Sequence, residues 1–428
     1  MIFACFAVIK NMIPIPEAIK IIKRETPCLL SETIELENSV GRVLAEIVKA
    51  DMDLPPFDRS QMDGFAVRVE DLQHIPAHLR IIGESVAGGG FDGKLKPNEA
   101  VRIMTGARVP IGANTVQKVE STKENYGFVE IWETAAKGQN INKTASEIKK
   151  GAKIFAKGEI ITEQMIAALA SFGYQNLKVF QKPSVEIIST GSEIVEISEK
   201  PQKDQIRNSN SMMLKILTEK AGANAKILPH VHDDFETLKH KIAEAVGIGA
   251  EIPISNFKIK KSQIRNPKSK ILIITGGVSV GDYDFTKPVL KELGAEIFFE
   301  KVSLKPGKPT VFARLNDVLI FGLPGNPVSV AVTHYLFART AILQMQSAKS
   351  SELKSGFAVC SDKIKSAKER DCYLPVSLST NKKGQLIIES LRFSGSSNFI
   401  AFSRADALVF VPQGKDLEKG KVAEILFL

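Results

Sequence analysis

The chain has few cysteines and few aromatic residues. Only four cysteines occur in 428 residues, and no two of them form a Cys-x-x-Cys pair. Scattered single cysteines are typical of a reduced, cytoplasmic protein, and they argue against a structural zinc site. Aromatic residues make up 7% of the chain, with a single tryptophan. This composition disfavours a protein that binds single-stranded nucleic acid by stacking its bases.

The chain also lacks a long hydrophobic run. Residues 1–9 are apolar, but a membrane-spanning helix needs about 20 such residues. No basic segment precedes them and no small-residue cleavage site follows, so we do not expect a signal peptide. Met12 precedes the first regular helical pattern, and we interpret residues 1–11 as an N-terminal extension. Either Met1 or Met12 can be the start of translation, and the sequence leaves this open.

Negative charge is the scarcer sign. The formal net charge is +9 and the pI is about 9.1. A basic balance suits anionic ligands, of which nucleic acid is only one. Because no helix-turn-helix or RNA-binding signature occurs, we expect neither nucleic acid nor a membrane as partner. Part of the excess lies in the lysine-rich stretch 249–269, which we interpret as a solvated insertion without assigned function.

The length exceeds one hydrophobic core and predicts two to four domains. Changes in hydrophobic pattern and in glycine and proline content place the boundaries. We expect an N-terminal helical linker domain (12–53 with 148–180), an inserted small β domain (54–147), an α/β domain (181–345) and a C-terminal β domain (346–428).

Strands alternate with helices through the third of these domains. We predict strands at 185–189, 225–228, 271–274 and 318–321, and helices at 211–221, 235–246, 285–293 and 328–343. This alternation predicts an α/β fold with a doubly wound, mostly parallel sheet. In such sheets the ligand crevice lies at the carboxyl ends of the strands.

Turns rich in glycine and hydroxyl groups follow several of these strands. Glycine lets the backbone approach an anion closely, and free N–H groups at a helix start point toward negative charge. A single turn of this kind is more often only a loop, but several at successive strand ends predict one anion-binding crevice. The turns contribute Ser189, Thr190, Gly191, Gly276, Gly277, Ser279, Gly281, Pro324, Gly325, Asn326 and Pro327, and a rigid cationic turn contributes Lys305, Pro306, Gly307, Lys308 and Pro309.

Three carboxylates stand beside these turns, namely Glu193, Asp234 and Asp284. Hard oxygen ligands from separate loops suit Mg²⁺ together with a bound phosphate. Helix capping is the alternative for Asp234 and Asp284, because both stand near predicted helix starts.

Taken together, these segments resemble the molybdopterin molybdenumtransferase (MoeA) family. The resemblance runs from about residue 12 to residue 428. It rests on residues 55–68, 102–110, 189–193, 275–284, 305–309 and 322–330, which stand in the order and spacing of the family.

The resemblance implies the last step of molybdenum cofactor assembly. Adenylylated molybdopterin and molybdate would be the substrates, Mg²⁺ the cofactor and AMP a product. It implies catalytic roles for Asp63, Thr105, Glu193, Asp234 and Asp284, the last three as metal ligands. It further implies a homodimer in which the partner subunit supplies the wall carrying Asp63 and Thr105, and contacts with the upstream molybdopterin adenylyltransferase. Molybdate contacts would be Lys305, Lys308, Arg370 and Ser397.

One stretch departs from the family pattern. Asn142, Ala145 and Ser146 stand where relatives carry Arg, Gly and Glu, so a role for these positions is not carried over. Two alternative functions stay open. One is an interaction scaffold, since animal relatives also cluster receptors; the other is an adenylyltransferase, which the α/β domain alone resembles. The inserted and C-terminal domains argue against the second. The preference for molybdate or tungstate and the recipient enzymes are left open.

Overall fold

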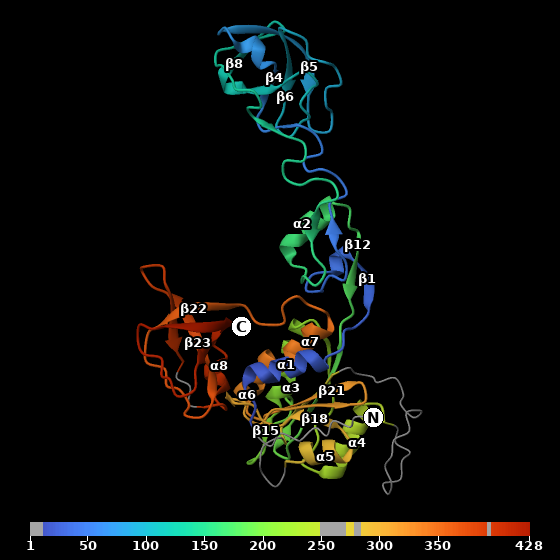
Figure 1. The fold of residues 1–428 in the computed structure, drawn as a ribbon, viewed down its shortest axis with the longest axis vertical. Helices are drawn as coiled ribbons and strands as arrows, with labels where there is room; N and C mark the ends of the chain where they lie inside the picture. Colours follow the sequence, from blue (N-terminus) through green and yellow to red (C-terminus); the bar gives the residue numbers. More distant parts are fainter. Residues whose placement is uncertain (1–11, 249–270, 278–283, 392–394) are drawn as a thin grey trace, which may run out of the picture. The chain divides into compact units, whose positions relative to one another are not determined.

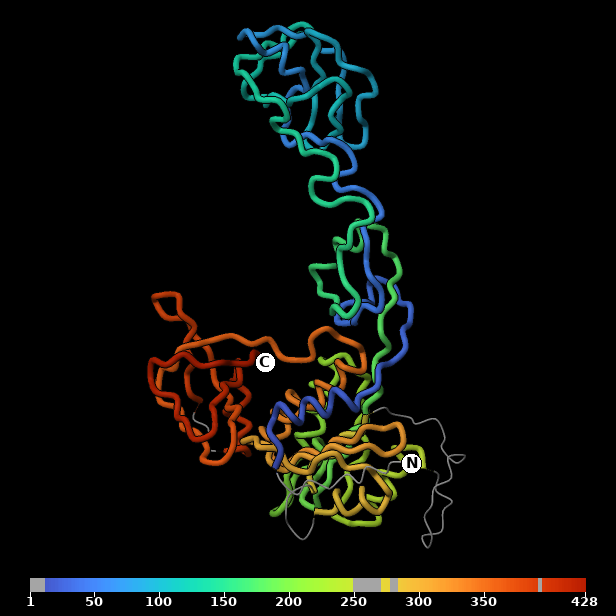
Figure 2. The backbone as a smooth tube through the Cα atoms, viewed as in Figure 1, coloured from blue at the N-terminus to red at the C-terminus, as the bar shows by residue number. Residues whose placement is uncertain are grey.

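The computed structural model describes residues 12–248, 271–277, 284–391 and 395–428. The chain forms two compact units. Unit 1 comprises Met1–Ala45, Gly158–Thr162 and Lys178–Leu428, and unit 2 comprises Glu46–Lys157 and Glu163–Leu177. Figure 2 shows the blue N-terminal part of the chain running into unit 2 and the green part returning from it. The predicted extension 1–11 and insertion 249–269 lie outside the described residues.

The two units divide the chain differently from the predicted domains. Residues 46–53 and helix α2 (Glu163–Ser171), which we assigned to the linker domain, belong to the β-rich unit 2. The α/β domain and the C-terminal β domain share unit 1. The predicted domain boundaries themselves stay predictions.

A six-stranded sheet forms the centre of unit 1 (Figure 1). Four of its strands, β16, β13, β17 and β21, are parallel, and each pairs with the next. Strands β20 and β18 follow β21 and run antiparallel to their neighbours. Their bounds, in sheet order, are Asn224–Ile227, Ser184–Ser189, Ile271–Thr275, Val318–Leu323, Val311–Leu315 and Glu296–Phe299.

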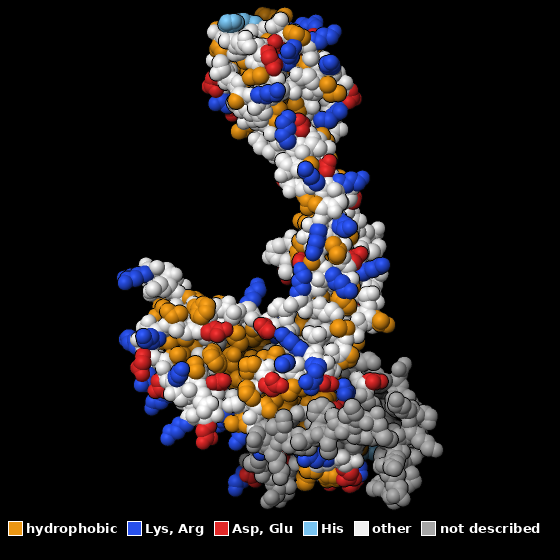
Figure 3. Space-filling model, viewed as in Figure 1, with side chains coloured by type: hydrophobic (Ala, Val, Ile, Leu, Met, Phe, Trp, Pro, Cys, Tyr) orange, Lys and Arg blue, Asp and Glu red, His pale blue; other side chains and the backbone are white. Residues whose placement is uncertain are grey.

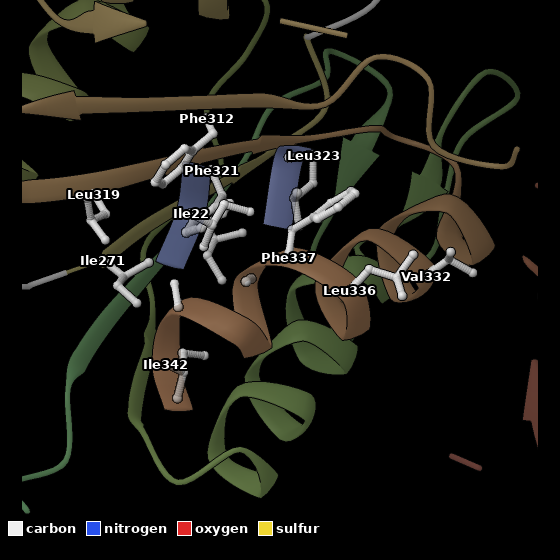
Figure 4. Packing of buried hydrophobic residues seen from close by; sticks show 14 of the residues in the cluster. Ile22, Ile271, Phe312, Leu319, Phe321, Leu323, Val332, Leu336, Phe337 and Ile342 are labelled. Carbon is white, nitrogen blue, oxygen red and sulfur yellow. The ribbon is translucent and has the colours of Figure 1, made fainter. Parts of the chain in front are cut away.

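Helices cover both faces of this sheet, because strands buried on both sides need an apolar layer on each. One face packs on α1 (Ile15–Glu25), α3 (Ser209–Lys220), α6 (Pro327–Thr333) and α7 (Arg339–Met345). Figure 4 shows this layer, in which Phe312 and Phe321 of the sheet lie close to Phe337 of the helical segment between α6 and α7. The other face packs on α4 (Phe235–Ala245) and α5 (Thr286–Glu292). The predicted doubly wound, mostly parallel sheet is confirmed.

Two local features differ from the sequence prediction. Strands β18 and β20 were not assigned as sheet members, and they run antiparallel to their neighbours. The single predicted helix 328–343 is interrupted, since α6 and α7 are joined by one π-helical segment, His334–Ala338. His334 lies there fully buried, and Thr218 Oγ1 is 3.0 Å from its Nε2. Burial lowers the pKa of His334 to about 3, so the ring is neutral.

The C-terminal domain is a closed β-barrel. Five strands pair in the ring β23–β24–β22–β26–β25, and β25 returns to β23. Full closure leaves none of these strands with an unpaired edge. The short strand β19 (Leu304–Lys305) pairs with the start of β23, and α8 (Phe399–Phe402) precedes β25. The ring strands are Asp371–Thr380, Leu386–Ser390, Ser355–Cys360, Val422–Phe427 and Ala407–Val411.

Apolar side chains gather on the face of unit 1 shown in Figure 3, where α1 meets the barrel. Ile15 and Ile19 of α1 line a hollow with Tyr373 and Phe410, whose rings are 5.2 Å apart. Burial, aided by nearby carboxylates, raises the pKa of Tyr373 to about 12.

Unit 2 is built on a second six-stranded sheet in the order β7–β4–β6–β5–β9–β8. All its pairings are antiparallel except that of β5 with β6. These strands span Thr115–Lys118, Gly64–Val67, Glu99–Ile103, Ala77–Ser85, Phe128–Ile131 and Thr122–Asn125. Further pairs join β2 (Val48–Lys49) to β11 (Lys153–Phe155) and β3 (Arg59–Ser60) to β10 (Ile141–Asn142).

Shorter elements connect these layers. Strands β1 (Ser31–Glu35) and β12 (Asn176–Phe180) pair with each other, as do β14 (Ile194–Val195) and β15 (Ile206–Arg207). Single 3₁₀ turns span Leu36–Asn38, Val69–Leu72 and Val119–Ser121.

Candidate active site

A cavity of about 910 Å³ opens at the carboxyl ends of β13, β17 and β21, where the sequence placed the ligand crevice. Four of the predicted turns and one segment of the barrel domain contribute to its walls. Of the predicted site residues, those lining it are Ser189, Thr190, Gly191, Glu193, Gly276, Gly277, Asp284, Pro309, Pro324, Gly325, Asn326, Pro327 and Ser397.

The turn after β17 is shaped by two glycines that no other residue can replace without strain. Gly276 and Gly277 have φ of 96° and 57°, a region that side chains disfavour. A Cβ at Gly276 would collide with the Thr190 carbonyl oxygen. At Gly277 it would lie 3.0 Å from Thr190 Oγ1 and 3.2 Å from Thr286 Oγ1. The turn therefore packs directly on the neighbouring loop. Ser279 and Gly281 lie outside the described residues.

Two hydroxyl groups beside this turn are buried, and among the described residues neither has a hydrogen-bond partner. They are Thr190 Oγ1 and Thr286 Oγ1. Because an unsatisfied buried hydroxyl costs free energy, such groups often mark a place where a ligand or a water completes the bonding. Both lie against Gly277.

The barrel domain reaches the cavity through one loop. Asn326 Nδ2 donates a hydrogen bond to Ser396 Oγ (3.0 Å), and the Val328 N–H donates to the Ser396 carbonyl (3.1 Å). These two bonds join the turn before α6 to the barrel, and they bring Ser397 and Phe399 to the cavity wall.

Two asparagines at the start of α3 were not recognised from the sequence. Asn208 caps α3 by accepting from the Ser211 N–H, and its Nδ2 donates to Ser189 Oγ (2.9 Å). Asn210 Nδ2 donates to the Gly325 carbonyl (2.6 Å) and to Thr275 Oγ1 (3.3 Å). These bonds hold three strand-end turns in one arrangement. The signal was an Asn-Ser-Asn stretch before a helix, which local pattern alone identifies only as a cap.

The adjacent residues Asp233 and Asp234, at the start of α4, have different roles: one lines the cavity and the other caps the helix. Asp234 is the N-cap, since its Oδ1 accepts from the Thr237 N–H at 2.7 Å. The hydrogen bonds from the side chain and backbone of Thr237 lower the pKa of Asp234. Asp234 does not line the cavity, whereas Asp233 does. The Ser192 N–H donates to Asp233 Oδ2 (3.3 Å), and the Asp233 N–H donates to Ser192 Oγ (3.2 Å). The capping alternative is therefore realised at Asp234.

The carboxylates do not form a ready-made metal centre. In the part of the chain that the structure describes, no three His, Cys, Asp or Glu side chains are grouped so as to hold a metal ion. Glu193, Asp233 and Asp284 nevertheless line one cavity. Mg²⁺ commonly takes only one or two carboxylates and completes its shell with water and substrate phosphate oxygens, and this donor set fits that mode.

Most of the predicted molybdate contacts lie together beside the cavity. Lys305 pairs in register with Cys372 through β19 and β23, and Arg370 Nη1 donates to the Leu304 carbonyl (3.3 Å). Lys305 and Lys308 are exposed. Gly307 packs so closely that a Cβ there would lie 2.6 Å from Thr333 Cγ2. Pro306 is joined to Lys305 by a cis peptide bond. Of the 305–309 turn, only Pro309 lines the cavity itself.

The two remaining predicted residues meet in unit 2. The N–H and the Oγ1 of Thr105 both donate to Asp63 Oδ1, at 2.6 and 2.8 Å. These bonds lower the pKa of Asp63 and keep its carboxylate charged. Both residues are exposed. The two turns that the sequence singled out in unit 2 thus form one surface site.

The fold and this cavity define a multi-domain protein built around a molybdopterin-binding type of α/β domain. Residues 13–173 match the MoeA N-terminal region (domains I and II), residues 186–250 and 258–344 a probable molybdopterin binding domain, and residues 358–428 the MoeA C-terminal region (domain IV). The chain belongs to the molybdopterin molybdenumtransferase (MoeA) family.

Full-length relatives support this assignment. The molybdopterin molybdenumtransferase of Staphylococcus aureus (strain COL) is 32% identical over 97% of this chain and 96% of its own length. That of Bacillus subtilis (strain 168) is 32% identical over 98% and 95%. A crystal structure of the molybdopterin biosynthesis protein MoeA from Pyrococcus horikoshii matches with a TM-score of 0.79 at 28% identity, over 98% of this chain and 100% of that chain. No helix in the described ranges is long and apolar enough to cross a membrane.

Proposed function

We propose that this chain is a molybdopterin molybdenumtransferase, which inserts molybdate into adenylylated molybdopterin and releases AMP. Cleavage of the substrate's pyrophosphate bond consumes one water, and replacement of an oxygen of molybdate by the two dithiolene thiols releases one. The observation that carries the proposal is the strand-end cavity of about 910 Å³, with its glycine turn and two buried hydroxyls that have no hydrogen-bond partner among the described residues, in a chain that matches 96% of the length of a family member.

The cavity residues supply what a pyrophosphate needs. We assign the turn Gly276–Gly277 with Thr190 and Thr286 to the phosphate oxygens, because a closely approaching backbone suits an oxyanion, as do hydroxyl groups without a partner among the described residues. Mg²⁺, when bound, would neutralise charge developing on the leaving phosphate. Glu193, Asp284 and Asp233 are our candidates to hold it, with Asp233 taking the role that the sequence gave to Asp234.

Molybdate requires a second oxyanion site. We assign it to Lys305, Lys308 and Arg370, which are joined to the phosphate cavity through Pro309, and to Ser397, which lines that cavity. Two separate anion sites keep the like charges of molybdate and pyrophosphate apart until the pterin dithiolene reaches molybdate.

Unit 2 supplies the remaining residues in this proposal. We propose a homodimer in which Asp63 and Thr105 of one subunit face the cavity of the other. An exposed carboxylate held charged by two hydrogen bonds fits a residue that acts on a neighbouring subunit's ligand. The upstream adenylyltransferase would deliver the substrate. We place the reaction in the cytoplasm, in keeping with the free thiols of Cys28, Cys360 and Cys372.

The direct test is to incubate the purified chain with adenylylated molybdopterin, Mg²⁺ and either molybdate or tungstate. We expect AMP release that depends on Mg²⁺ and on the oxyanion, and the two oxyanions will reveal the preferred metal. A parallel reaction with ATP and unmodified molybdopterin is the control. Formation of the adenylate there would reassign the chain to the preceding step, and absence of AMP release in the first reaction would refute the proposal.

A further inference from the structure

The cavity walls carry three carboxylates, but Arg207 is their one lysine or arginine among the described residues. None of the cations expected from the sequence, namely Lys305, Lys308 and Arg370, lines this cavity. A pyrophosphate brings at least two negative charges, which glycine turns and hydroxyls alone do not neutralise. The position of Arg207 is therefore chemically distinct within the site.

The backbone of Arg207 is fixed by a short parallel ladder. Strand β15 pairs with β14, so that Arg207 lies in register with Val195. The Ile206 N–H donates to the Glu193 carbonyl (2.8 Å), and the Asn208 N–H donates to the Val195 carbonyl (2.9 Å). The same ladder thus holds the carboxylate-bearing Glu193 and the cationic Arg207 at a constant spacing.

The guanidinium group is also oriented. Arg207 Nε donates to the Glu199 carbonyl at 2.9 Å. This bond uses the Nε edge and leaves the two terminal nitrogens available, and no acidic side chain of the described residues forms an ion pair with them. A planar guanidinium whose two terminal nitrogens are free can bind phosphate in a bidentate manner through that one edge, and its partial immobilisation lowers the entropy lost on binding.

We propose that Arg207 binds phosphate oxygens of the adenylylated substrate, in the cavity that it lines together with the Gly276–Gly277 turn. The inference rests on the proposed function. It separates two groups of cations in unit 1. Arg207 binds the phosphates in the cavity, whereas Lys305, Lys308 and Arg370 bind molybdate beside it.

The test compares binding of AMP and adenosine to the full chain in the presence of Mg²⁺, by calorimetry. For Arg207→Gln we expect AMP affinity to fall by about 10- to 100-fold, the usual size for loss of a charge-assisted hydrogen bond. Adenosine affinity should stay unchanged, because only AMP carries the phosphate. Arg207→Lys, which keeps the charge and loses the planar fork, should give an intermediate affinity.

Lys215→Gln is the matched control. Lys215 lies on α3 and pairs with Glu219 at 2.7 Å, away from the cavity lining. It should leave AMP and adenosine binding unchanged, and the thermal midpoints of all variants should agree with the parent chain. A structural role of Arg207 would weaken both ligands together, whereas the proposal requires loss of AMP alone.

The outcomes separate the two proposals. If the parent chain releases AMP from its substrate while Arg207→Gln binds AMP as tightly as the parent does, the role of Arg207 is refuted and the proposed function stands. If the parent chain neither binds AMP nor releases it, the proposed function fails, and the inference fails with it.

Discussion

The two units present their predicted site residues in opposite ways. In unit 1 the cavity is shaped by closely packed backbone turns, with glycines at positive φ, two buried hydroxyls, and asparagines that join neighbouring turns. In unit 2 the Asp63–Thr105 pair is an exposed carboxylate held by two hydrogen bonds on a β-rich surface. The glycine turn of unit 1 has no room for an added Cβ, whereas the Asp63–Thr105 pair of unit 2 is exposed to solvent. The cavity of unit 1 therefore depends on the shape of its backbone turns, and the pair in unit 2 depends on two individual side chains.

The largest effect is expected from Gly276→Ala. Its Cβ would collide with the Thr190 carbonyl and displace the turn, so AMP release should fall by about 100-fold or more, as expected for a displacement of about 1 Å in a catalytic site. Gly294→Ala is the matched control, because Gly294 has φ of 77° and no atom within 4 Å of its added Cβ. It should lower stability by about 1 kcal/mol and leave AMP release intact. Equal activities of the two variants would refute a site shaped by backbone.

Mixing inactive variants tests the contribution of unit 2. Asp63→Ala and Asp284→Ala should each abolish AMP release, because they remove acidic groups from the two proposed walls. Co-expressed in equal amounts, they should recover about a quarter of the parent activity, since a mixed dimer retains one intact site. A mixture that stays inactive, with mixed dimers shown by mass spectrometry, would place both residues in the site of one subunit.

Adjacent aspartates offer a smaller and more local test. Asp233→Ala should lower AMP release by about 10- to 100-fold, because a carboxylate of the cavity wall is lost. Asp234→Ala removes the N-cap of α4 and should cost about 1 kcal/mol in the free energy of unfolding, with a lesser effect on turnover. Turnover rates and denaturant midpoints of both variants decide between them. The reverse pattern would restore Asp234 as the catalytic carboxylate.

The smallest expected effect is a difference between the two units in how far their stability falls at acidic pH. His334 of unit 1 has its pKa lowered from 6.5 to about 3, so the unfolded chain binds a proton that the folded unit does not. Its contribution to stability is full above pH 6.5 and is lost progressively as the pH falls toward about 3. The histidines of unit 2, His74 and His78, are exposed. Hydrogen exchange at pH 7 and pH 4.5 should therefore show unit 1 losing protection first, and His334→Gln should reduce that difference.

Much of the α/β domain could be predicted from the sequence because its signals are local. Four strands and the helices that follow them were identified from apolar runs and glycine stops, and they form the predicted mostly parallel sheet. Strands β18 and β20 were missed as sheet members, because an antiparallel extension of a parallel sheet carries no signal that distinguishes its strands from connecting segments. The π-helical segment at His334 was likewise invisible, since its residues keep a helical apolar pattern.

The candidate site was predictable in its turns and less so in its individual side chains. Gly276 and Gly277 could be identified because a tight turn with positive φ requires glycine, so that the residue type itself marks the turn. Arg207, Asn210 and Asp233 were not, because each acquires its place through partners distant in sequence or through the register of a helix start.

The sequence by itself determined the sheet and the strand-end turns, because hydrophobic periodicity and glycine content act over a few neighbouring residues, and its motifs carried the resemblance to the family. Only the tertiary structure decided which of two adjacent aspartates faces the cavity, which cation lines it, and how the barrel closes on itself. The physical reason is that these outcomes depend on contacts between segments far apart in the chain. A single-residue shift at a helix start turns one carboxylate into a cap and leaves its neighbour in the cavity.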